Sequence, residues 1–94
     1  MTFLSYARRI RGRTAFVHGG KALDMDLGGG LEQVLEGLID QGAKRIVLTL
    51  GDMKFLHFTL FATLLSVQRL LQEKGGDLIL AEVPWFVQMR FHQL

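Results

Sequence analysis

The stretch between residues 45 and 71 constrains the fold most, because it joins a strand pattern directly to a long helical pattern. Residues 46–50 read I-V-L-T-L, a run typical of a strand buried on both faces, as in a parallel sheet. From about Leu60, apolar residues recur at helical spacing. The turn between them, residues 51–59, holds Asp52, Lys54, His57 and Thr59. In a parallel sheet, the strand's carboxyl end and the next helix's amino end meet at one edge, where functional sites usually lie.

Strand and helix patterns follow one another in the order β-β-α-β-α-β. The strands are predicted at residues 3–10, 14–18, 44–50 and 77–82, and the first two form a hairpin around residues 11–13. Helices are predicted at 31–41 and from 59 or 60 to 74, ended by Gly42 and by Gly75 with Gly76. Pro84 opens a short C-terminal helix. We therefore expect an α/β fold with a small, mixed, mostly parallel four-stranded sheet.

The two longer helices are predicted to be amphipathic. Gly37 lies inside the first and costs up to ~1 kcal/mol there, so we expect it to permit a close approach to a neighbour. The second helix carries a core stripe widened by Phe61 and Leu65, with polar or small residues opposite. The inward residues are Leu31, Val34, Leu35, Leu38 and Ile39 in the first helix and Leu60, Leu64, Val67 and Leu71 in the second; Ala62, Ser66, Arg69 and Glu73 face outward.

Composition narrows the class of protein. The chain has 94 residues, 49% of them apolar, which suits a single domain spanning residues 1–94. Cysteine is absent, so disulfides and thiolate metal sites are excluded. The first arginines follow a very short apolar run, the wrong order for an export signal. The longest nearly uncharged run, residues 55–68, is shorter than the roughly 20 residues that cross a bilayer. We expect a soluble cytoplasmic protein without membrane insertion.

Basic residues cluster near the amino terminus although the net charge is only +2. Arg8, Arg9, Arg11 and Arg13 could form a patch for nucleic acid. They could equally guard an edge hairpin against strand-to-strand aggregation. Because no aromatic residue or binding motif accompanies the cluster, the edge hairpin is favoured and no nucleic-acid partner is expected.

The loop at residues 21–30 contains three consecutive glycines and two aspartates. A phosphate-binding loop would need a G-K-[ST] ending or G-x-G-x-x-G spacing, and neither is present. Asp24 and Asp26 lack further ligands at metal-binding spacing, so they are interpreted as solvated loop acids. No cofactor is predicted.

His57 is the one histidine in the turn before the second helix. A metal site would need further ligands, and His18 and His92 lie on different elements. A catalytic base would need a partner acid or nucleophile, which the sequence does not supply. A partly buried, hydrogen-bonded histidine is the favoured interpretation, so neither a metal nor an enzyme activity is expected. The neighbouring Phe58 either enters the core or enlarges an apolar docking surface.

The C-terminal segment carries more large apolar side chains than a solvated tail would. They must cover the sheet or meet a partner, since exposed apolar patches usually mark interaction surfaces. The candidates for self-association, as in a homodimer, are Trp85, Phe86, Met89 and Phe91.

Three stretches of the chain resemble the STAS family, which contains the anti-sigma factor antagonists. Residues 43–56 (A-K-R-I-V-L-T-L-G-D-M-K-F-L) and 70–84 (L-L-Q-E-K-G-G-D-L-I-L-A-E-V-P) are similar to the family's third strand and its passage from helix to fourth strand. Residues 20–24, G-K-A-L-D, resemble its G-x-L-D loop with one extra residue. The resemblance covers nearly the whole chain and implies a STAS-like domain that is shortened in its C-terminal helical region.

The resemblance also implies a regulatory site at Thr59. Switching members carry D-S-S-G at the start of the second helix, and the second serine accepts a phosphate. Here the matching positions are His57, Phe58, Thr59 and Leu60, so Thr59 falls on the acceptor position while the other three depart. The residue types alone predict Thr59 as an N-cap worth ~1 kcal/mol. A phosphate there would face the positive end of the helix dipole.

The function implied by the resemblance is a non-catalytic interaction module. Its partner would be an anti-sigma factor with serine/threonine kinase activity, in partner switching that regulates transcription. The alternative is an accessory subunit without switching, for example one that holds the ATPase of a lipid-transporting ABC complex. The predicted partner-binding residues are Asp24, His57, Phe58, Thr59, Ala62, Ser66 and Arg69.

Overall fold

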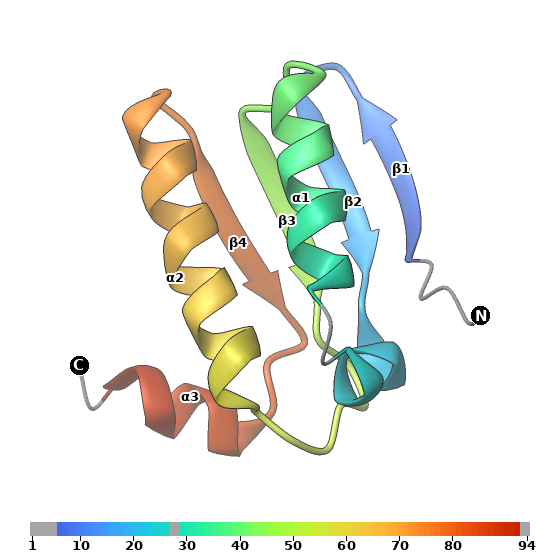
Figure 1. Ribbon diagram of the computed structural model, residues 1–94, viewed down its shortest axis with the longest axis vertical. Coiled ribbons are helices and arrows are strands. Elements are labelled where there is room, and N and C mark those ends of the chain that lie inside the picture. Colours follow the sequence, from blue (N-terminus) through green and yellow to red (C-terminus); the bar gives the residue numbers. More distant parts are fainter. Residues whose placement is uncertain (1–5, 27–28, 93–94) are drawn as a thin grey trace.

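In the computed structural model, which describes residues 6–26 and 29–92, four strands form one sheet in the order β1-β2-β3-β4 (Figure 1). The antiparallel hairpin consists of β1 (Ala7–Arg11) and β2 (Thr14–His18). Parallel pairs then join β2 to β3 (Arg45–Thr49) and β3 to β4 (Asp77–Ala81). The expected α/β fold with a mixed, mostly parallel four-stranded sheet is confirmed.

Helices α1 (Gly30–Asp40) and α2 (Phe58–Glu73) lie side by side on one face of the sheet (Figure 1). A short 3₁₀ helix, η1 (Gly20–Met25), takes the place of the loop expected after β2. Helix α3 (Trp85–His92) follows β4. Figure 1 shows η1 and α3 at the end of the sheet where the parallel strands finish. Several elements therefore lie around the start of α2 at this end of the sheet.

Both long helices end at the predicted glycines. Gly42 has φ 103°, and the bonds from its N–H to the Ile39 carbonyl and from the Ala43 N–H to the Leu38 carbonyl close a Schellman motif. Gly75 ends α2 with the same pattern of bonds. A residue with a Cβ would be strained at such a φ.

The core lies between the sheet and the two helices. Alternate residues of β2 and β3 point into it, because successive side chains of a strand face opposite sides. Burying each large aliphatic side chain contributes roughly 1.5–3 kcal/mol. Helix α3 adds Val87, which is fully buried. The buried set includes Ala15, Val17, Ile46 and Leu48 from the strands and Leu31, Leu35, Leu38, Leu60, Leu64, Val67 and Leu71 from the helices.

The opposite face of the sheet corrects one expectation. Predicted burial of β3 on both faces is wrong, since Val47 and Thr49 are only half-buried and no described helix covers them (Figure 1). The strand order explains this. Two crossovers of the same hand that step in the same direction across a sheet place both helices on one face.

Two further sequence expectations need correction. The first strand spans Ala7–Arg11 rather than residues 3–10, of which 3–5 lie outside the described residues. Ile10 within this strand is exposed, whereas Tyr6, directly before it, is buried. Leu65, expected to widen the core stripe of α2, is also exposed. No helix in the described part of the chain has the length and apolar character needed to cross a membrane.

Candidate functional site

The turn between β3 and α2 is held against η1 by the Asp24 side chain. Its carboxylate accepts hydrogen bonds from the backbone N–H groups of Lys54 at 2.9 Å and Phe55 at 3.0 Å. Met53 anchors the turn from within because its side chain is buried in the core. The interpretation of Asp24 as a solvated loop acid is therefore wrong. It joins two segments that lie about 30 residues apart in the chain.

His57 adds a second link between the same two segments. Its Nε2 lies 2.9 Å from the Asp24 carbonyl oxygen. Because a carbonyl oxygen can only accept, Nε2 carries the hydrogen and donates it. The half-buried ring also packs near Phe55, with 6.0 Å between ring centroids. The expectation of a partly buried, hydrogen-bonded histidine is confirmed.

Thr59 lies two residues beyond the N-cap of α2 rather than at it. Helix α2 begins at Phe58, and His57 is its N-cap, so the interpretation of Thr59 as the N-cap is wrong. The shift has a physical cause: hydrogen bonds from Lys54, Phe55 and His57 to Asp24 hold the turn in place. His57 has an extended conformation, and helical geometry starts directly after it. Thr59 is exposed, and none of the hydrogen bonds between described residues involves its hydroxyl.

Three large apolar side chains are exposed around this turn. Phe58 is 81% exposed, Met25 70% and Phe55 59%. Met25 adjoins Asp24 at the end of η1, and Phe55 and Phe58 lie before and after His57 in the chain. The hydrogen bonds to Asp24 therefore hold the segments that carry these three residues against each other. We call Met25, Phe55 and Phe58 the rim cluster. Phe58 thus takes the second of its two predicted roles, since it adds apolar surface instead of entering the core.

The outward face of α2 continues from the rim cluster. Thr59, Ala62, Ser66 and Arg69 are all exposed and recur at helical spacing, so they share one face. The predicted outward orientation of Ala62, Ser66 and Arg69 is confirmed, and the role of all four residues in partner binding stays a prediction. Sequence reasoning placed Phe58 at this surface but missed Met25 and Phe55, because only the fold brings η1 beside the turn.

The C-terminal candidates divide into two sets. Phe86 and Phe91 pack against the core, and the Phe91 ring meets the Phe61 ring at a tilt of 50°, with 4.9 Å between ring centroids. Trp85 and Met89 are 72% and 55% exposed and lie four residues apart, on the outer side of α3. Only Trp85 and Met89 therefore offer apolar surface for self-association.

The N–H groups at the start of α1, which follow the glycine-rich segment, already bind a carboxylate of the protein, that of Asp26. The Asp26 carboxylate accepts hydrogen bonds from the N–H groups of Gly30 at 2.9 Å and Leu31 at 2.6 Å, and it also accepts the Tyr6 hydroxyl. Asp26 is buried, so its interpretation as a solvated acid is wrong. These N–H groups are the ones that a phosphate would use at a helix start. Gly28 lies outside the described residues.

The arginine cluster lies on the β1–β2 hairpin, as predicted. All four arginines are exposed, and none forms a salt bridge with another described residue. An aromatic residue does accompany them, which corrects the sequence interpretation: the Arg9 guanidinium lies 5.0 Å from the centroid of the Phe16 ring. Among the described residues, no three histidine or acidic side chains come together as a metal site would require.

Comparisons with known proteins do not extend this description. No family model matches the chain, and no curated protein is found to be similar to it.

Proposed function

We propose that this chain is a STAS-like interaction module that binds a protein partner at the start of α2 and catalyses no reaction. The observation that carries the proposal is the rim cluster, Met25, Phe55 and Phe58, exposed on a turn that is pinned by hydrogen bonds. Large exposed apolar side chains on a fixed backbone suit binding, because little conformational entropy is lost when a partner covers them. The element order and the resemblance in residues 43–56 and 70–84 support the family assignment.

Phosphorylation of Thr59 would regulate this surface. Thr59 is the second residue of α2, and the first turn contains no acidic side chain. A phosphate would therefore meet the free N–H groups and the positive end of the helix dipole without a like charge in that turn. It would add between one and two negative charges beside the rim cluster, which would repel an acidic partner surface or attract arginines. The folded domain would not have to rearrange.

The partner proposed from the resemblance is a cytoplasmic anti-sigma factor with serine/threonine kinase activity. Phe58 favours a second candidate, an accessory subunit that holds an ATPase without switching. It presents a large apolar side chain where switching members carry a small polar one, and burying such a side chain stabilises a lasting complex by roughly 1.5–3 kcal/mol.

One experiment separates the proposal from its alternatives. The protein is incubated with an anti-sigma kinase and ATP, the phosphorylated residue is mapped by mass spectrometry, and the affinity of the complex is measured by calorimetry. We expect Phe58→Ser to weaken the complex at least tenfold, about 1.4 kcal/mol, because it removes the most exposed apolar side chain of the rim cluster. Met89→Ser, which removes an exposed apolar side chain from α3, serves as the matched control and should bind normally.

The phosphate map then decides between the two candidates. Phosphate on Thr59 that disappears in Thr59→Ala supports regulated switching. A stable complex without phosphate supports the accessory subunit. If Phe58→Ser and Met89→Ser bind alike, the start of α2 is not the interface and the proposal fails.

A further inference from the structure

β1 is an edge strand whose outer side is unpaired in the described part of the chain. The two-residue turn Gly12–Arg13 makes Arg11 and Thr14 the closing hydrogen-bonded pair of the hairpin. Because hydrogen-bonded and non-hydrogen-bonded pairs alternate in an antiparallel ladder, the backbone groups of Arg8 and Ile10 point away from β2. They are available to another strand.

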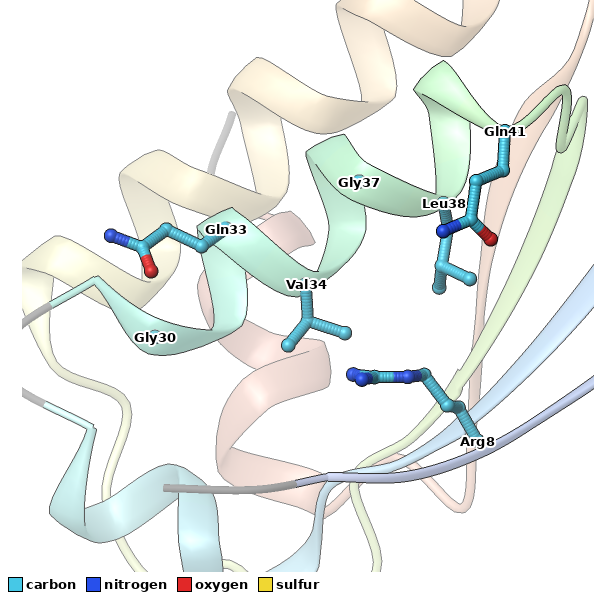
Figure 2. Close-up of a pocket in the computed structure, with 7 residues that line it drawn as sticks. All are labelled: Arg8, Gly30, Gln33, Val34, Gly37, Leu38 and Gln41. Atoms are coloured by element: carbon cyan, nitrogen blue, oxygen red, sulfur yellow. The ribbon is translucent and has the colours of Figure 1, made fainter. Parts of the chain in front are cut away.

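A groove runs between this edge and α1. Figure 2 shows the Arg8 side chain extending toward Val34 of the helix, with Gln33 and Gln41 on either side. The groove has a volume of about 260 Å³. Arg8 lies opposite Val17, whose side chain points to the helices, so side chains of an added strand on this face would also enter the groove.

Gly37 keeps the groove open. Gly30, Val34, Gly37 and Gln41 form one stripe along α1 that faces Arg8, and the two glycines leave gaps in it. A Cβ added at Gly37 would meet nothing within 4 Å, so the expectation of a close approach at this glycine is wrong. The glycine costs helix stability, and no atom of residues 6–26 or 29–92 uses the space beside it.

The charges around β1 indicate which kind of strand pairs with it. Arg8, Arg9, Arg11 and Arg13 are exposed and form no salt bridge with another described residue. A second copy of the chain pairing through β1 would bring these arginines against one another, and like charges in cross-strand positions are destabilising. An acidic strand would meet the opposite charge along its whole length.

We propose that β1 is a second binding surface, which takes an extended acidic segment of a partner protein by strand addition. The segment's backbone pairs with Arg8 and Ile10. Its alternate apolar side chains enter the groove along Val34 and Leu38, and its carboxylates, on the opposite face of the sheet, meet Arg9 and Arg11. This edge lies across the sheet from α2 and does not depend on the function proposed for the start of α2 (Figure 1).

The test is an NMR titration of the full chain with a capped peptide that alternates valine with glutamate and spans β1. We expect the largest amide shifts at Arg8 and Ile10, protection of both amides from hydrogen exchange, and an affinity that falls steeply with added salt. Gly37→Leu should weaken binding at least tenfold because the leucine fills the groove. Gln72→Leu adds the same exposed side chain to α2 and should leave the affinity for the peptide unchanged.

Two further comparisons complete the test. Arg11→Ala should weaken binding more than Arg90→Ala, which removes an exposed arginine of α3, and N-methylation of alternate peptide amides should abolish binding by removing strand pairing. The proposal is overturned if a valine–lysine peptide binds as well, if Gly37→Leu folds by circular dichroism yet binds normally, or if no binding occurs at millimolar peptide. Tighter binding of a single-stranded oligonucleotide, with the largest shifts at Phe16, would overturn it in favour of nucleic acid.

Discussion

Gly76 packs against the backbone of Lys44 at the point where β4 joins the sheet. A Cβ at this glycine would lie 1.6 Å from the Lys44 carbonyl oxygen, which accepts the Asp77 N–H at 3.1 Å. Because both sides of the contact are backbone, no side-chain rotation can relieve it. We expect Gly76→Ala to lower the free energy of unfolding by at least about 3 kcal/mol, measured by chemical denaturation.

The control for Gly76→Ala is Gly37→Ala. A Cβ at Gly37 meets open space within α1, so this change should raise the free energy of unfolding by up to ~1 kcal/mol. Equal effects at the two glycines would show that helix propensity and backbone freedom, rather than the contact with Lys44, govern Gly76.

Tyr6 provides a pH-dependent prediction, and it is the only tyrosine in the chain. Burial raises the pKa of its hydroxyl far above the ordinary value, and the hydrogen bond to Asp26 and the charge of that carboxylate raise the pKa further. The folded protein therefore keeps this proton above pH ~10, where the unfolded chain loses it. Since the unfolded state then binds fewer protons, the free energy of unfolding falls as pH rises above ~10.

Ultraviolet absorbance of tyrosinate measures this directly. We expect no titration near pH 10 in the folded protein and titration near pH 10 in denaturant. Comparing the unfolding free energy of the wild type with that of Tyr6→Phe isolates a contribution of at most about 1.4 kcal/mol per pH unit. A folded-state midpoint near pH 10 would contradict the prediction.

The glycines that end α1 and α2 were predictable from the sequence, and the contacts that hold the helix starts were not. Gly42 and Gly75 end α1 and α2 because a glycine tolerates the left-handed conformation, which is a local property of the residue. The start of α2 depends on a contact that spans 33 residues of the chain, whereas the start of α1 depends on a carboxylate four and five residues before the N–H groups that it bonds. His57 becomes the N-cap of α2 while its ring bonds to the Asp24 carbonyl oxygen, and the first N–H groups of α1 are bonded by Asp26 across the glycine segment.

Only part of the candidate site was predicted, because only part of it follows from local patterns in the sequence. The exposure of Thr59, Ala62, Ser66 and Arg69 follows from helical periodicity, which the sequence carries. Asp24 was predicted as a partner-binding residue, but its hydrogen bonds were not predicted. Its bonds to Lys54 and Phe55 exist only once η1 folds against the turn.

At the scale of the whole molecule, α3 leaves one apolar pair uncovered. Val87, Phe86 and Phe91 pack inward, while Trp85 and Met89 lie outward. We expect the protein to self-associate through this pair, so that light scattering gives a mass above 10.6 kDa that rises with concentration. Emission of the single tryptophan should shift to shorter wavelength in parallel.

A double variant, Trp85→Ser with Met89→Ser, should remain monomeric at every concentration. Phe58→Ser is the comparison, since it removes an equally exposed apolar side chain from the start of α2 and should leave self-association unchanged. A wild-type protein that scatters as a monomer throughout would refute the role of α3.

The sequence by itself determined the order of elements, the helix ends and the inward faces of α1 and α2, because periodicity and glycine conformation act within a few residues. The tertiary structure alone decided the rest. It left one face of the sheet open through the direction of the crossovers, turned Asp24 and Asp26 into internal hydrogen-bond acceptors, and assembled the rim cluster from η1 and the turn before α2. Each of these depends on contacts between segments distant in the chain, which local patterns do not encode.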